Sequence, residues 1–338
     1  MHHQIPTPAA PSGAAGPSRA ADALRRGVDC GVLAPSVHNT QPWRFELHED
    51  RLVVRADRSR QLAALDPTGR ELVQSVGAAL FNVRVGIAAS GWSSAVERLP
   101  DPRDRDVLAV VRPVVPTADP ALAVLADAVA VRRTNRRAFV AAELPDAVLR
   151  GLTAGAAAEG ALLVPVLHET HRRLLARLTQ QADRLQHAES AYRAELRQWT
   201  NRRPEDGDGV PAAAVPYVDG RQHDDLPLRD FDTSGAGGLP AETSSGVDGS
   251  LLLLATRSDE PLAWLRCGEA MERVLLELTV LGWSASPFTQ LIEVPLTRTQ
   301  LRSALTWDAH PQLLLRVGHA DPTPPTPRRR VDEVVHTG

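Results

Sequence analysis

A unit that occurs twice restricts the fold of this chain more than any other feature of its sequence. This unit is a long apolar helix that ends at a Gly-Trp pair. Apolar side chains recur at helical spacing over 69–92, and Gly91-Trp92 closes the pattern. A second apolar helix is predicted over 262–281 and is followed directly by Gly282-Trp283. A short stretch containing serine follows each pair, but the remaining similarity is weak, so an internal duplication is a hypothesis.

Predicted strands alternate with predicted helices in both halves, which favours an α+β or α/β sandwich. The predicted helices lie at 21–33, 69–92, 120–131, 146–155, 171–199 and 262–281. The predicted strands lie at 42–47, 51–55, 107–111, 162–167, 251–255 and 312–317. The strand 251–255 is entirely apolar, which is typical of a strand that is buried on both faces.

Two segments lack the period of a helix or a strand. Residues 1–20 consist mainly of Ala, Pro, Gly and Ser, which predicts a disordered tail. The tail has no basic start followed by an apolar stretch, so no secretory signal is predicted and a cytoplasmic location is expected. Residues 202–249 are rich in Pro, Gly, Asp and Ser, and an irregular stretch of this length predicts a lid, a binding loop or disorder.

The composition excludes several kinds of chemistry. The sequence contains no lysine, so all 38 basic residues are arginine. A Walker A lysine, a lysine Schiff base with pyridoxal phosphate and a lysine general base are therefore excluded. The net charge of −3 argues against a nucleic-acid partner and gives no reason to expect a membrane partner. With only Cys30 and Cys267, and no other metal-ligand spacing, neither a disulfide framework nor a bound metal is expected.

The segment 34–45 holds the densest group of small polar side chains. Ser36 and Asn39 lie between Pro35 and Pro42, which restrict the backbone. Their hydroxyl and amide groups offer donors and acceptors at one point, which suits a planar heterocycle with polar groups along one edge. The alternative is a helix end and turn that Ser and Asn stabilise.

Two arginine clusters are candidates for an anion site. In Arg132-Arg133-Thr134-Asn135-Arg136, alternate arginines and a hydroxyl can converge on one phosphate through charge-assisted bonds. The second cluster is Arg328-Arg329-Arg330. Each cluster is alternatively a solvated basic patch, and the sequence leaves open whether the two clusters meet in space.

Together these segments resemble the FMN-dependent nitroreductases. Residues 34–45 resemble their Pro-Ser-x-x-Asn-x-Gln-Pro-Trp signature, 132–136 resemble their Arg-Arg-Ser-x-Arg phosphate motif, and 327–335 resemble the basic segment before their C-terminal arm. Asp-Pro-x-Gly-Arg-Glu-Leu at 66–72 and Pro-Gln-Leu-Leu-Leu-Arg-Val-Gly at 311–318 are similar to the Acg-like branch, which fuses two nitroreductase-like halves. The resemblance covers most of the chain after the tail, except the irregular region.

The resemblance implies an α+β, nitroreductase-like fold with a first half at 21–131, a second half at 132–338 and an irregular lid at 202–249. Each subunit of an ordinary nitroreductase dimer carries every motif. Here the Pro-Ser signature occurs only in the first half and the arginine motif only in the second. This split implies one composite FMN site per chain, and a protein that functions as a single chain, an internal pseudo-dimer.

The resemblance also implies roles for individual residues. Arg132, Thr134 and Arg328 would hold the FMN phosphate, with Arg330 as the alternative to Arg328, because the similarity at the C-terminus leaves the register open. Arg136 would lie near the pyrimidine edge of the flavin, where a cation stabilises the reduced form. Thr289 and Gln290, where the family often has Glu-Gly, are the candidates for contact with flavin N5 and O4. The implied cofactor-binding residues are Pro35, Ser36, Asn39, Arg132, Thr134, Arg136, Pro287, Thr289, Gln290, Arg328 and Arg330.

The implied function is two-electron transfer from NAD(P)H through FMN to a small-molecule acceptor. No side-chain acid is required, because the flavin performs the chemistry. The alternative is an FMN storage or sequestering protein, in which the lid covers the flavin and prevents nitroreductase turnover. Within the lid, the small apolar segment 209–216 is predicted to cover the cofactor, and the rest of the region is predicted to be mobile.

Overall fold

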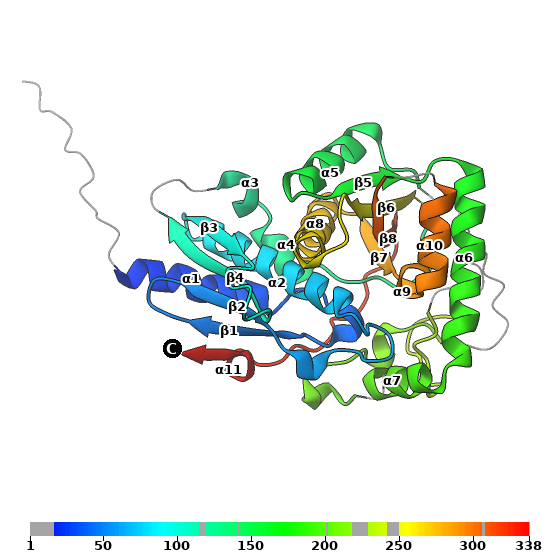
Figure 1. Cartoon of the computed structure of the whole chain (residues 1–338), viewed down its shortest axis with the longest axis horizontal. Helices are drawn as coiled ribbons and strands as arrows, with labels where there is room; N and C mark the ends of the chain where they lie inside the picture. The colour runs from blue at the N-terminus through cyan, green and yellow to red at the C-terminus, as the bar shows by residue number, and fades with distance from the viewer. Residues whose placement is uncertain are drawn as a thin grey trace, which may run out of the picture.

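The fold is described by a computed structural model for residues 17–114, 119–140, 142–200, 202–217, 229–241, 250–305 and 308–337. Two sheets lie on either side of a central pair of long helices (Figure 1). The predicted α+β class is confirmed. The division into two nitroreductase-like halves stays a prediction.

The first sheet combines four strands from the first half with one from the C-terminus, in the order β3-β4-β2-β1-β9. Its strands are β1 (Trp43–Leu47), β2 (Leu52–Ala56), β3 (Ser93–Arg98), β4 (Val107–Val114) and β9 (Val335–Thr337). All neighbours pair antiparallel except β9, which runs parallel to β1 with Val335 opposite Phe45. The C-terminal segment therefore crosses the molecule and completes the sheet of the first half.

The second sheet is antiparallel, with the order β5-β6-β8-β7. Its strands are β5 (Leu162–Pro165), β6 (Ser250–Thr256), β7 (Ser284–Phe288) and β8 (His310–Gly318). Alternate residues of β6 pack into two different cores, because Leu252 and Leu254 join the central core while Leu251 and Leu253 join the core under α6. The expectation of a strand buried on both faces is confirmed for this segment.

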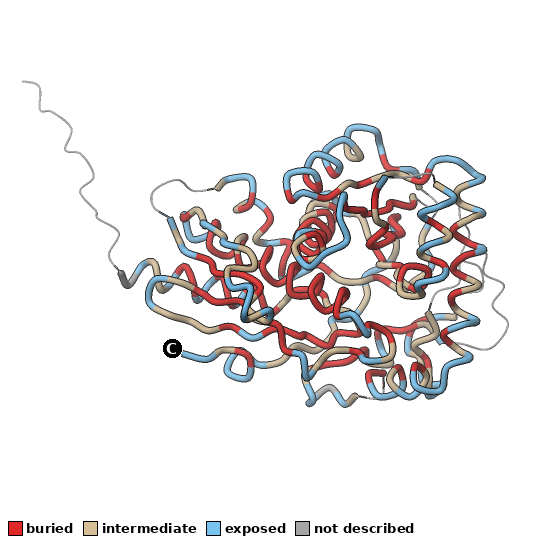
Figure 2. The backbone as a smooth tube through the Cα atoms, viewed as in Figure 1, coloured by how far each residue is buried: buried red, intermediate tan, exposed pale blue. Residues whose placement is uncertain are grey.

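The helices cover both sheets and fill the space between them (Figure 1). They are α1 (Pro17–Gly31), α2 (Arg70–Ala89), α3 (Pro120–Ala123), α4 (Ala126–Val131), α5 (Asp146–Ala158), α6 (Glu169–Ala188), α7 (Ser190–Thr200), α8 (Pro261–Val280), α9 (Gln290–Glu293), α10 (Pro295–Ala304) and α11 (Val331–Val334). Helices α6, α9 and α10 share a core with β6 and β8, so they cover one face of the second sheet. Figure 2 shows the buried face of α6 turned toward this core and its other face exposed.

Helices α2 and α8 cross at close range because each carries a glycine at the contact. A Cβ atom on Gly77 would lie 2.2 Å from the carbonyl oxygen of Leu265, and one on Gly268 would lie 2.0 Å from that of Gln74. No larger residue fits at either position while the helices keep this distance. Gly77 and Gly91 are 14 residues apart, as are Gly268 and Gly282, which agrees with the hypothesis of an internal duplication.

Helix α2 is the one helix among the described residues that is long and apolar enough to cross a membrane. In the structure it is a core helix. Nearly all of its side chains are buried between α1, α8 and the first sheet, as Figure 2 shows.

The structure differs from the predicted elements in a few places. The predicted helix 120–131 is divided into α3 and α4, and the predicted helix 171–199 is divided into α6 and α7 at Glu189, whose backbone is extended. Strands β3 and β7, which follow the two Gly-Trp pairs, and helix α10 were not predicted. Both strands begin with serine and lack a clean apolar alternation, so they gave no periodic signal.

Candidate functional site

Three segments from distant parts of the sequence meet beside α2 and line one cavity. They are 35–38, 134–136 and 286–290. The middle segment is held against β7, because the backbone N–H of Asn135 donates to the carbonyl of Ala285 at 3.0 Å. The cavity encloses about 890 Å³ outside the protein atoms, part of it open to solvent.

The loop that contains the Pro-Ser signature carries backbone strain. His38, Asn39 and Gln41 have φ angles of 47°, 56° and 51°, in the left-handed region that residues other than glycine seldom adopt. Strain of this kind persists only where surrounding contacts hold it, and it is concentrated at functional sites.

Hydrogen bonds from two other segments hold this loop in place. The Asn39 Nδ2 donates to the carbonyls of Gly209 and Pro327, both at 2.9 Å. The Gln41 side chain donates to the carbonyl of Gly207 and accepts from the backbone N–H of Arg329, both at 2.8 Å. The first-half loop is therefore fixed by the irregular region and by the C-terminal segment.

A second pocket adjoins this cavity, and the walls of the two share Pro35, Ser36, Thr134 and Arg136. This second pocket, which we call the anion-binding end, has more positive than negative charge. Arg132, Arg133, Arg136 and Arg328 line it. Arg132 is only 4% exposed, and its Nε and Nη1 atoms make no hydrogen bond. Its ion-pair partner Glu272 is 3.4 Å from Nε. Buried N–H groups without an acceptor are costly, so this end is suited to an anionic ligand.

The electrostatics at this end of the cavity favour a ligand that carries more than one negative charge. Burial and the nearby Arg132 lower the pKa of Arg328 to about 9, and Arg328 Nε has no partner. Burial raises the pKa of Glu272 to about 7, so at neutral pH this carboxyl offsets the arginines only in part. Arg328 Nη1 donates to Asn39 Oδ1 at 3.0 Å. This hydrogen bond joins the C-terminal arginine cluster to the Pro-Ser signature. A phosphate group fits this donor set through charge-assisted hydrogen bonds.

Arg136 lies between the anion-binding end and the rest of the cavity, since it lines both. Its guanidinium carbon is 4.8 Å from the ring centre of Phe231, and its Nη1 has no hydrogen-bond partner. Burial and the nearby Arg229 lower the pKa of Arg136 to about 10. A ligand with partial negative charge near this guanidinium would be stabilised.

The opposite wall is formed where β7 passes into α9. Pro287, Thr289 and Gln290 line the cavity here. The Gln290 side chain is buried, and its Nε2 donates to Asp183 Oδ1 at 2.9 Å.

Ten of the eleven predicted cofactor-binding residues line this cavity or the anion-binding end that adjoins it. Those in its larger part are Pro35, Ser36, Thr134, Arg136, Pro287, Thr289 and Gln290. Those found only at the anion-binding end are Asn39, Arg132 and Arg328. The exception is Arg330, whose side chain is 76% exposed and pairs with Asp332. Of the two alternatives left open by the sequence, the structure places Arg328 at the cavity and Arg330 on the surface.

The irregular region contributes to the cavity from two places. Val210 and Pro216 of the predicted covering segment line it, and so do Arg229 and Phe231. That segment 209–216 covers the cofactor stays a prediction, and Arg229 and Phe231 come from the part of the region that was predicted to be mobile. The parts 218–228 and 242–249 of the predicted lid lie outside the described residues.

Sequence reasoning missed several residues of the cavity. Glu71 of α2 lines it. The motif 66–72 contains Glu71, but the sequence predicts no role for this residue in the site. Arg229 and Phe231 had no signal, because they lie in a region without periodicity. His38 lies in the predicted signature, and its place in the cavity wall is established by the structure. Over the described ranges, no group of three or more His, Cys, Asp or Glu residues could hold a metal ion.

Comparisons with known proteins give long matches in sequence, among them two proteins of Mycobacterium tuberculosis. The chain is 38% identical over 324 residues to "Putative NAD(P)H nitroreductase Rv3131" of Mycobacterium tuberculosis H37Rv, which covers 93% of this chain and 91% of that protein. It is 33% identical over 327 residues to "Putative NAD(P)H nitroreductase acg" of the same strain, covering 93% and 96%. No protein-family model matches the chain. Among solved structures, the FMN-dependent nitroreductase NfnB from Mycobacterium smegmatis in complex with NADPH is 17% identical, with a TM-score of 0.40 over 64% of this chain and 99% of that one.

Proposed function

Because the chain belongs to the nitroreductase family, in the branch of the Acg and Rv3131 proteins of M. tuberculosis, we propose that it is an FMN-dependent oxidoreductase. It takes electrons from NAD(P)H and passes two of them to a small-molecule acceptor. It binds one FMN per chain in the cavity beside α2 and functions as a single chain.

The observation that carries this proposal is the unsatisfied positive charge at one end of the cavity. Arg132 is buried there, and its Nε and Nη1 atoms make no hydrogen bond. Arg328 is half-buried, and its Nε atom also lacks an acceptor. The two arginines come from two motifs that resemble segments of the family, and they are 196 residues apart in the sequence. A cofactor with a terminal phosphate and a planar ring fits a cavity with one positively charged, anion-binding end and one larger end.

The bound FMN would supply hydride transfer at its N5 atom. The residues of this chain would bind and orient it: Arg132, Thr134 and Arg328 at the phosphate, Arg136 at the pyrimidine edge, and Thr289 with Gln290 beside N5 and O4. The loop residues Pro35 and Ser36 would contact the ring from the first half, and Asn39 would lie at the phosphate end beside Arg328. The strained loop and its hydrogen bonds keep these contacts fixed before the cofactor binds.

The test is the flavin content of the purified protein and its response to nicotinamides. We expect a yellow protein with about one FMN per chain, whose absorbance near 450 nm is bleached by NADPH or NADH without oxygen. Two flavins per chain, or FAD in place of FMN, would contradict the composite site.

A second candidate function is FMN storage without turnover. It is favoured by Arg229 and Phe231, since both come from the irregular region and line the cavity where a nicotinamide would have to approach. The same anaerobic experiment separates the two functions. Bound FMN that dithionite reduces but neither nicotinamide does would favour storage.

Replacing Arg136 with glutamine is expected to lower the midpoint potential of the bound flavin. The variant keeps a hydrogen-bonding side chain but removes a positive charge, so the reduced flavin loses stabilisation. We expect a decrease of about 30 mV or more, which corresponds to roughly 1.4 kcal/mol for a two-electron couple. A potentiometric titration of the FMN-loaded protein measures it. An unchanged potential with FMN still bound would place Arg136 away from the flavin.

A further inference from the structure

Gln290 lies between the cavity and helix α6. It is 2% exposed, and it lines the cavity at the point where β7 passes into α9. The Nε2 atom of its carboxamide donates to the Oδ1 atom of Asp183 at 2.9 Å. Asp183 belongs to α6 and is not part of the cavity wall. The nitrogen end of the carboxamide is therefore directed toward α6.

The chemistry of Asp183 decides which end of the carboxamide points this way. A carboxylate has acceptors and no donor, so it accepts from the Gln290 nitrogen and would repel the Gln290 oxygen in the same place. Turning the carboxamide over would remove one hydrogen bond and bring two acceptors together. Asp183 therefore selects one of the two orientations that a carboxamide of this shape can adopt.

A histidine one turn further along α6 holds the carboxylate of Asp183. The Nδ1 atom of His187 is 3.4 Å from Asp183 Oδ1 and 2.9 Å from the carbonyl oxygen of Asp183. The hydrogen bond with the Asp183 side chain raises the pKa of His187 to about 8, although partial burial opposes this rise. The imidazole is thus mostly a cation at pH 7 and forms an ion pair with the carboxylate. Since His187 is 40% exposed, the contacts run from the surface of α6 through Asp183 to Gln290.

The oxygen end of the carboxamide is left for a ligand. No donor in the described part of the chain reaches the Oε1 atom of Gln290, and this atom is not fully enclosed by protein. Because Gln290 lines the cavity, Oε1 is an acceptor within reach of a molecule bound there. An amide oxygen only accepts hydrogen bonds, so it favours a ligand that presents an N–H over one that presents a bare ring nitrogen.

We propose that Asp183 is a positioning residue that turns the Oε1 atom of Gln290 toward the flavin, where it favours the reduced cofactor. The inference rests on the proposed function and deepens it, because it assigns a role to the Gln290 side chain beside N5 and names the residue that directs it. The N5 atom of oxidised FMN is itself an acceptor and gains nothing from Oε1. The N5 atom of reduced FMN carries a hydrogen, which it can donate to Oε1. This hydrogen bond forms only in the reduced state, so it raises the midpoint potential of the bound flavin.

The test is the midpoint potential of FMN bound to variants of the full chain, measured by potentiometric titration. Gln290→Met keeps the length of the side chain and removes the acceptor. The ratio of the dissociation constants of oxidised and reduced FMN should then fall about 3- to 10-fold, the effect of one hydrogen bond. This corresponds to a decrease of about 15–30 mV for a two-electron couple.

Asp183→Ala should also lower the potential, because the freed carboxamide can turn its nitrogen toward the flavin. The sign of this change is informative, since removing a negative charge would by itself raise the potential. Asp183 is 29% exposed on the outer helix α6, so alanine at this position should not prevent folding. An unchanged or raised potential in this variant, with FMN still bound, overturns the inference.

A double variant shows whether Asp183 acts through Gln290. Effects that pass through one contact are not additive, so Asp183→Ala should lower the potential no further when Gln290→Met is already present. A role of Asp183 that bypasses Gln290 would give the same change in both backgrounds.

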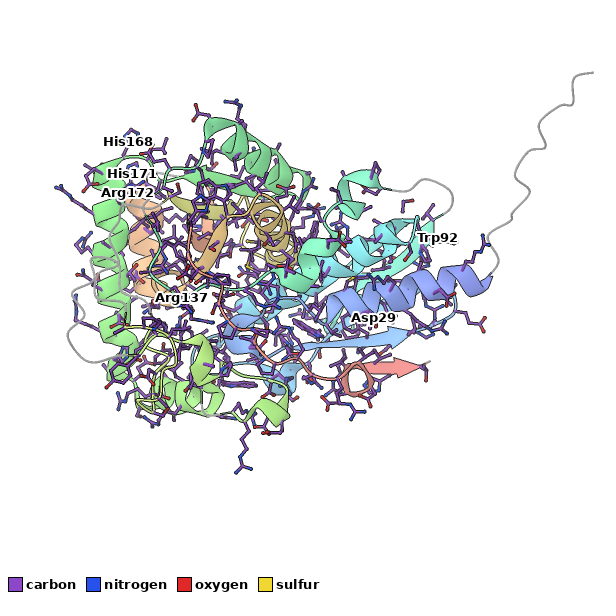
Figure 3. The ribbon with its side chains drawn as sticks, turned by 180° about the vertical axis from the view of Figure 1, so that it is seen from behind. Asp29, Trp92, Arg137, His168, His171 and Arg172 are labelled. Atoms are coloured by element: carbon purple, nitrogen blue, oxygen red, sulfur yellow. The ribbon has the colours of Figure 1, made fainter. Side chains whose placement is uncertain are left out.

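The control is Glu169→Ala, which removes an exposed carboxylate from the same helix and should leave the potential unchanged. Glu169 directly follows His168, which lies at the outer end of α6 and away from the middle of the molecule (Figure 3).

Failure of this inference is distinguishable from failure of the proposed function, because dithionite with redox mediators drives the titration and no nicotinamide is needed. If nicotinamides do not reduce the flavin but both single variants lower its potential, the proposed oxidoreductase activity fails and the role of Asp183 stands. If nicotinamides reduce the flavin and Gln290→Met leaves its potential unchanged, the role of Gln290 and Asp183 fails and the proposed function stands.

Discussion

Arg132→Ala is expected to weaken FMN binding by at least about 30-fold, corresponding to a loss of about 2–5 kcal/mol for a buried, charge-assisted contact. Arg132 is buried, its Nε and Nη1 lack hydrogen bonds, and it lies beside Arg328 at the anion-binding end of the cavity. Removing it deletes one phosphate partner and leaves Glu272 buried without its counter-charge. The measurement is the dissociation constant of FMN for the apoprotein, from flavin fluorescence.

Two neighbouring arginines serve as controls for this prediction. Arg330→Ala removes an exposed side chain that pairs with Asp332, so FMN affinity should be unchanged. Arg133→Ala should have a smaller effect than Arg132→Ala, because the Arg133 guanidinium donates to the carbonyls of Ala130 and Arg132. Equal FMN affinity of the Arg132 and Arg330 variants would remove Arg132 from the phosphate site.

Gly268→Ala is expected to destabilise the fold by about 1–3 kcal/mol or more, the usual range for an overpacked core. The new Cβ would lie 2.0 Å from the carbonyl oxygen of Gln74, which is backbone and cannot rotate away. Helices α2 and α8 would have to separate, and much of the central core packs around them. Urea unfolding followed by circular dichroism gives the change in the free energy of unfolding.

Gly151→Ala is the matched control for the substitution at the helix crossing. Gly151 is an exposed glycine inside α5, and a Cβ there meets no atom within 4 Å. Alanine should stabilise this helix by about 0.5–1 kcal/mol, because glycine loses more backbone entropy on folding. A Gly268→Ala variant as stable as the wild type would show that the helices do not approach this closely.

The parts of the fold with strong local patterns could be predicted from the sequence. The long helices α2 and α8 and the strand β6 have unbroken apolar patterns, and their predicted bounds agree with the structure within a few residues. Strands β3 and β7 could not be predicted, because their pairing with β4 and β8 decides their conformation and their own composition does not. The break at Glu189 was missed for a similar reason, since helical spacing continues on both sides of it.

The candidate site was predictable where it rests on motifs and unpredictable where it rests on contacts in space. The Pro-Ser and arginine motifs named seven residues that line the cavity or its anion-binding end, and the resemblance of the segment after the second Gly-Trp pair named three more. The choice between Arg328 and Arg330 needed the path of the C-terminal segment, which the hydrogen bond from Asn39 to Pro327 fixes. Arg229 lies in a region without helical or strand periodicity. Its place in the cavity wall depends on hydrogen bonds to four residues that are far away in the sequence.

The glycine crossing of α2 and α8 has a consequence for how the protein responds to dilution. The two helices belong to one polypeptide, so their contact is a unimolecular event with a fixed effective concentration. A cofactor site shared between separate subunits empties when the subunits dissociate at low protein concentration. Because we propose that this chain functions alone, we expect its cavity to have no such dependence. Occupancy by FMN should then be set by the concentration of free FMN alone, down to the most dilute solutions.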